Sequence, residues 1–158
     1  MIRYFESFND SATPMVEISE EIAKAKGYYA IEVTGDGVQR HFIIVSDGVA
    51  TRVAYPDSSP SPELEALIRN RDLRVPSWII SPVEHDNETT KYTVWSYDAA
   101  GQLEHRTEHI YDSRHAKSTW YLPVGALGGW MERDFAEDGS QIEAREFSAA
   151  TGRTIVHD

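Results

Sequence analysis

The chain has 158 residues, the length of one ordinary domain, and its 26 acidic residues against 15 basic ones give a net charge of −11. Such a charge repels nucleic-acid phosphates, which argues against DNA or RNA as a partner. Cysteine is absent, which excludes disulfides, cysteine nucleophiles and cysteine-ligated zinc.

The first residues predict a strand, since Met1–Phe8 alternates weakly and carries three aromatic side chains. It holds no apolar run of signal-peptide length, and no window of the chain approaches the roughly 18 apolar residues of a membrane span. We therefore expect a cytoplasmic protein with no membrane contact, folded as a single domain over residues 1–158.

A helix is predicted next, over residues 14–26. Thr13 is a suitable cap, Pro14 suits the first helical position, and Gly27 is the expected stop. One apolar stripe follows the helical period, formed by Ile18, Ile22 and Ala25.

A three-strand meander is predicted after this helix, over residues 29–34, 39–46 and 49–55, with Asp47-Gly48 as a two-residue hairpin turn. Ser61 and Pro62 then open a short helix over residues 62–70. Residues 75–82 are apolar but bounded by prolines, which suits either an edge strand or a buried connection.

The remainder of the chain is strand-like, with a glycine in most of its turns. The predicted strands cover residues 91–97, 102–111, 117–122, 130–135, 141–147 and 153–157. Together these elements predict an α+β fold: a large, twisted antiparallel β-sheet with one N-terminal helix and one short helix. A sheet with so many strands must be covered or curl, so we expect a meander arranged as a half-barrel or in two layers.

Three segments of the C-terminal half share a pattern of an aromatic residue, a short polar turn, a glycine and an apolar residue: 97–104, 135–143 and 147–155. Ordinary hairpin chemistry accounts for this pattern, because glycine adopts the positive φ that a short loop needs. Over residues 95–156 the pattern also resembles the β-hairpin repeats of bacterial YD-type and MORN-like proteins. Some MORN-like families are antitoxins or toxin-immunity proteins, so the resemblance implies such a role.

The sharpest motif match is His105 to His109, which fits the H-x-x-E-H zinc signature. That signature needs a helix, whereas on the strand predicted here the two histidines lie about 13 Å apart, too far for one zinc ion. A cross-strand pairing of either histidine with His115 or His85 stays open. We predict no metal site, no cofactor and no catalytic group.

Acidic residues are densest near the predicted strand 130–135, where alternation places Trp130, Glu132 and Asp134 on one face. An exposed aromatic beside carboxylates is typical of an interface for a basic partner, although a solvated sheet face has the same composition. The predicted partner-binding residues are Trp130, Glu132, Asp134, Glu137, Asp138, Glu143 and Glu146.

Two functions follow from these observations. The first is a non-catalytic acidic binding protein, namely an immunity protein or antitoxin that occludes the active site of a basic toxin, such as a nuclease. The alternative is a small enzyme or ligand-binding barrel. Its pocket would be lined by the four tryptophans, Trp78, Trp95, Trp120 and Trp130, with His105 or His109.

Overall fold

The computed structural model describes residues 1–9 and 15–157, which form thirteen strands and two helices. The chain divides into two compact units. The first unit comprises Met1–Pro82 and Ser96–Leu103, and the second comprises Val83–Trp95 and Glu104–Asp158. The chain therefore passes from one unit to the other three times. The expected sheet-rich fold with two helices is confirmed at this level.

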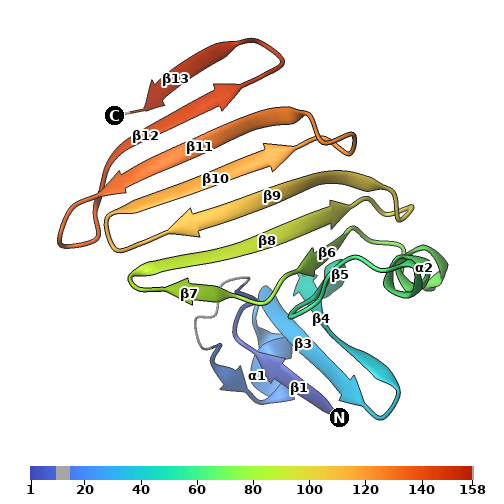
Figure 1. Ribbon diagram of the computed structural model, residues 1–158. Helices are drawn as coiled ribbons and strands as arrows, with labels where there is room; N and C mark the ends of the chain where they lie inside the picture. The colour runs from blue at the N-terminus through green and yellow to red at the C-terminus, as the bar shows by residue number, and fades with distance from the viewer. Residues whose placement is uncertain (10–14, 158) are drawn as a thin grey trace. The chain divides into compact units, whose positions relative to one another are not determined.

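The sheet of the first unit has the strand order β2-β1-β3-β4-β5-β6 (Figure 1). Its strands are β1 (Ile2–Phe5), β2 (Glu17–Ile18), β3 (Tyr28–Gly35), β4 (Val38–Ser46), β5 (Val49–Tyr55) and β6 (Ser77–Ile80). The predicted meander β3-β4-β5 is confirmed, but β6 runs parallel to β5, so the sheet is not wholly antiparallel. A parallel neighbour needs a crossover, which the helix α2 (Pro62–Asn70) provides.

The first helix is shorter than predicted. It is α1 (Glu20–Ala25), and Ser19 caps it by accepting a hydrogen bond from the Ile22 N–H at 3.3 Å. The predicted start at residue 14 is wrong, because Glu17 and Ile18 pair as β2 with Phe5 and Tyr4 of β1. The predicted cap residues 13 and 14 lie outside the described residues.

The core of the first unit lies on both faces of its sheet. Under α1, the fully buried Ala23 packs with Tyr29 and Val45, whereas Ile22 of the predicted stripe is half exposed. On the other face Phe5 and Phe8 contact Phe42 with ring centroids 5.8 and 5.3 Å apart. The first unit is thus an ordinary sheet with packed apolar layers.

The sheet of the second unit is an antiparallel meander whose strands neighbour one another in chain order (Figure 1). They are β7 (Glu84–Asp86), β8 (Thr89–Tyr97), β9 (Leu103–Tyr111), β10 (His115–Tyr121), β11 (Leu127–Phe135), β12 (Gln141–Ser148) and β13 (Arg153–His157). The ends of two of them, Ser96, Tyr97 and Leu103, belong to the first unit. The strands predicted from residue 91 onward are all present.

Burial in the second unit alternates in β8, where Tyr92 and Val94 are buried between exposed or partly exposed residues, but it does not alternate in β10 and β13, as it would on a sheet that covers a core. All seven residues of β10 are partly exposed, and all five of β13 are exposed. Among its described residues the buried apolar side chains are Tyr92, Val94 and Ala144. This sheet therefore leaves side chains of both faces open to contact.

Candidate functional site

The register of the second unit places Trp130, Glu132 and Asp134 on one face, as alternation predicts. On β10 their partners are Thr119, Lys117 and His115, and on β12 they are Phe147, Arg145 and Glu143. We call these nine residues the Trp130 face. It brings together four of the seven predicted partner-binding residues: Trp130, Glu132, Asp134 and Glu143.

The carboxylates of the Trp130 face are ion-paired. Glu132 Oε1 lies 2.8 Å from Lys117 Nζ, and Asp134 Oδ1 lies 2.8 Å from His115 Nδ1. Arg145 joins the row, with Nη2 3.1 Å from Asp134 Oδ2 and Nε 3.1 Å from Glu143 Oε1. The acidic residues predicted for this face are therefore paired with Lys117, His115 and Arg145.

These contacts lower the pKa values of two carboxyl groups. The hydrogen bond from Lys117 lowers the pKa of Glu132 by more than burial raises it, and the charges of Lys117 and Arg145 lower it further. The hydrogen bond from His115 lowers the pKa of Asp134, and Arg145 adds to this effect. Both groups are held in the ionised form.

An aromatic pair lies beside these ion pairs. The rings of Trp130 and Phe147 stack with centroids 5.9 Å apart and an interplanar angle of 22°. The Lys117 ammonium lies 5.4 Å from the centre of the Trp130 ring, within the range of a cation–π contact. Both aromatic side chains are partly exposed. The face therefore offers a rigid apolar spot bordered by fixed charges.

The other three predicted residues lie elsewhere. Glu137 is in the β11–β12 turn, 2.6 Å from Arg114, and Asp138 accepts hydrogen bonds from Ser140 in the same turn. Glu146 pairs with Met131, one register position from Glu132, so its side chain is on the opposite face. The predicted group of seven thus does not form a single patch on one face.

The opposite face carries the histidine motif. His105 and His109 are both on β9, so the pair is on a strand and not on a helix, as predicted. His109 Nδ1 lies 2.9 Å from Ser118 Oγ, and its ring stacks on Tyr92 at 4.6 Å. His115 is on the Trp130 face. No group of three possible metal ligands occurs within residues 1–9 and 15–157.

The predicted pocket of tryptophans and histidines does not form. Trp130 is opposite Thr119 and Trp120 is opposite Gly129, so the two indoles are on opposite faces of one sheet. Trp78 belongs to the first unit, where the Arg52 guanidinium stacks on its ring at 4.0 Å. A shallow depression of about 430 Å³ lies beside His105 and Trp120.

A larger pocket, of about 640 Å³, lies in the first unit, and the sequence did not reveal it. Its walls come from β4, β5, α2 and the segment that follows α2. Its residues include His41, Ile43, Val53, Tyr55, Leu67 and Leu73. The sequence holds only an indirect indication of this pocket. A helix between β5 and a following apolar segment indicates a crossover connection, but it does not indicate that a cavity lies under the helix.

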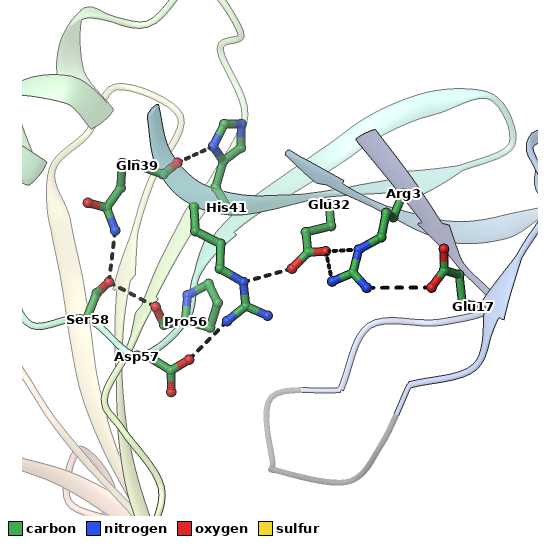
Figure 2. Close-up of polar contacts among 9 residues, drawn as sticks. Arg3, Glu17, Glu32, Gln39, His41, Pro56, Asp57 and Ser58 are labelled. Carbon is green, nitrogen blue, oxygen red and sulfur yellow. Dashed lines mark hydrogen bonds and ion pairs between the residues drawn. The ribbon is translucent and has the colours of Figure 1, made fainter. Parts of the chain in front are cut away.

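The first unit also holds a buried charged cluster (Figure 2). Glu32 is 1% exposed, and its two oxygens accept hydrogen bonds from Arg3 Nε at 2.7 Å and Arg40 Nε at 2.8 Å. The arginines reach outward to Glu17 at 3.5 Å and Asp57 at 3.1 Å. The two arginines engage both Glu32 oxygens, and the cluster thereby joins β1, β3 and β4.

No helix in the described part of the chain has the length and apolar character needed to cross a membrane.

Comparison with known proteins identifies no relative of this chain. No family model, curated protein or solved structure matches the chain.

Proposed function

We propose that this protein acts by binding another protein, without catalysis, and that the Trp130 face contacts the partner. The supporting observation is the stacked Trp130–Phe147 pair, partly exposed on a sheet whose two faces are both accessible. Tryptophan anchors bordered by charged groups contribute disproportionately to binding energy at protein interfaces. The two rings stack on each other and Lys117 contacts Trp130, so these side chains lose little conformational entropy when a partner binds.

The net charge of −11 favours a basic partner. Opposite net charges speed the encounter of two proteins over distances longer than a contact. The narrower form of the proposal is an immunity protein or antitoxin that occludes the active site of a basic toxin, in keeping with the hairpin repeats. A nucleic-acid-cleaving toxin needs a basic cleft, and an acidic protein competes with phosphates for it.

Because the carboxylates of the Trp130 face are ion-paired, long-range attraction and specificity come from different features of the molecule. Glu132 and Asp134 already hold Lys117, His115 and Arg145, so they supply little unpaired charge at the contact. Attraction therefore comes from the acidic surplus of the whole chain, and specificity from the aromatic pair. Reversing Glu132 would leave Lys117 unpaired and disturb the sheet, so aromatic truncation is the cleaner test.

The test uses titration calorimetry with basic proteins taken as candidate partners from the neighbouring reading frames. Trp130→Ala should weaken binding about 30-fold, the loss expected for an aromatic anchor worth about 2 kcal/mol. Met131→Ala, one residue away on the opposite face, is the matched control and should change affinity less than about threefold. Equal effects of the two variants, or none, would contradict the assignment of this face.

A further inference from the structure

We propose that the pocket beneath α2 in the first unit binds a small organic cation, with an apolar ring and an amine. This site is separate from the Trp130 face and does not depend on the proposed partner. Three properties of its lining support the proposal: its apolar walls, one free ring nitrogen, and the negative sign of its net charge.

The size and walls of the pocket suit a small molecule. Its volume of about 640 Å³ is within the roughly 300–1,000 Å³ of typical ligand sites. Ile43 and Val53 of the sheet form apolar walls. At the mouth Val38, Leu67 and Leu73 are 47%, 43% and 37% exposed. Single exposed aliphatic residues are ordinary, but three from separate segments around one opening form an apolar rim that a ligand would cover.

His41 supplies a hydrogen-bonding group to the lining. Its Nδ1 lies 2.8 Å from the Gln39 carbonyl oxygen, which can only accept, so Nδ1 carries the hydrogen (Figure 2). In the neutral ring Nε2 is then the acceptor. The ring is further oriented by Tyr55, at 5.7 Å between centroids. An N–H donor of a ligand therefore has a preoriented acceptor.

The charged side chains of the lining, Glu63, Asp72 and Arg71, carry a net negative charge. Glu63 and Asp72 are exposed, and neither forms an ion pair with another described residue. Arg71 donates to the carbonyls of Leu73, at 2.7 Å, and Val75, and contacts the Tyr55 hydroxyl at 3.5 Å, so its single positive charge is directed at these groups and offsets only one of the two carboxylates. An amine is thus favoured over a carboxylate in this pocket.

The experiment compares two probes with the same ring, tryptamine and indole-3-propionate, by NMR titration of the full chain. Tryptamine should shift the signals of His41, Leu67 and Val53, and should bind at least tenfold more tightly than the carboxylate. If neither probe shifts these signals at millimolar concentration, or if the carboxylate binds as well as the amine, the proposal is overturned.

Two variants locate the site and its charge preference. Leu67→Trp fills the pocket from an exposed helix position and should abolish binding of both probes. Combined Glu63→Gln and Asp72→Asn should remove the preference for the amine. The control is the combined variant Glu20→Gln and Glu21→Gln, which removes the same amount of charge from α1 and should keep the preference for the amine. Binding that survives Leu67→Trp, or a preference lost equally in both double variants, places the probe elsewhere and contradicts the site.

Discussion

Glu32 shows how a single residue can be both buried and charged. Burial alone would raise its pKa, but the hydrogen bonds and charges of Arg40 and Arg3 outweigh burial and hold the pKa below its ordinary value. The Arg40 guanidinium lies 5.4 Å from the centre of the Phe42 ring, and that of Arg3 lies 5.3 Å from the centre of the Phe5 ring. Both arginine side chains cover an aromatic ring on one side and stay partly exposed to water on the other. The carboxylate therefore has two counter-charges without two buried arginines.

We predict that Glu32→Gln lowers the free energy of unfolding by about 2 kcal/mol, because an amide does not compensate two guanidinium groups. The figure is below that of a fully buried pair, since Arg3 and Arg40 are 42% and 44% exposed. Urea unfolding at pH 7 measures it. Glu17→Gln in the same cluster removes an exposed pair and should cost less than about 0.5 kcal/mol. Similar losses in the two variants would contradict the role of burial.

A second prediction concerns acid. A lowered folded pKa gives stability that is present above the unfolded value, near 4.5, and is lost as the pH falls through the folded value. The difference in unfolding free energy between the native chain and Glu32→Gln should thus be constant above pH 5 and shrink below pH 4.5. Urea unfolding of both chains from pH 7 to pH 3.5 measures it. A difference that grows on acidification would show the opposite sign of the pKa shift.

Among the elements, β11 contains a point where no side chain is tolerated. A Cβ on Gly129 would come within 2.3 Å of the Phe147 carbonyl oxygen and 2.4 Å of the Trp120 ring, both far below contact distance. Trp120 thus lies over the glycine and packs directly on the backbone. The sheet of the second unit uses this packing in place of a deep core.

We therefore predict that Gly129→Ala destabilises the second unit by about 2 kcal/mol or more, because the indole must move off the strand. The control is Gly139→Ala in the β11–β12 turn, where a Cβ has open space and the positive φ of 81° costs about 1 kcal/mol. Thermal unfolding followed by Trp fluorescence compares the two. A smaller loss at Gly129 than at Gly139 would refute this packing.

Local chemistry made several elements predictable. Asp47 and Gly48 both adopt positive φ, 50° and 75°, as their two-residue hairpin turn requires. Ser61 caps α2 by accepting from the Leu64 N–H at 3.1 Å. The sequence misplaced the start of α1 because β2 forms through a pairing with β1, a non-local contact. The parallel partner of β5 was missed for the same reason.

The candidate site was predictable only in part. Period-two alternation places Trp130, Glu132 and Asp134 on one face without any knowledge of neighbouring strands. Which bases pair with those carboxylates depends on the register of β10 and β12. Turn lengths and bulges set that register, and the β11–β12 pairing shifts between Asp134 and Phe135. Charge density alone therefore predicted an acidic face but not the ion pairs that occur on it.

For the molecule as a whole, the two units differ in how they are held together. The first buries Phe42, Ile44, Val45, Val53 and Ala54 on adjacent strands, whereas the second relies on cross-strand pairs with partly exposed side chains. Opening a strand exposes less apolar surface in the second unit. Local stability should differ accordingly.

We predict that amides of β4 and β5 exchange at least tenfold more slowly than those of β12 and β13. Hydrogen–deuterium exchange at neutral pH, read by mass spectrometry on peptides of each strand pair, measures the difference. Because both pairs are antiparallel, strand geometry does not differ between them. Equal protection would show that cross-strand pairs stabilise the second unit as well as a packed core stabilises the first.

The division of the chain between its units restricts how the units can be separated. Segment Ser96–Leu103 belongs to the first unit, where the Tyr97 hydroxyl donates to Glu65 at 2.8 Å and Gly101 lies against Arg69. The second unit continues on either side of that segment. No single cut in the chain therefore releases either unit intact. A fragment that ends at Pro82 lacks Ser96–Leu103, and one that begins at Glu104 lacks Val83–Trp95.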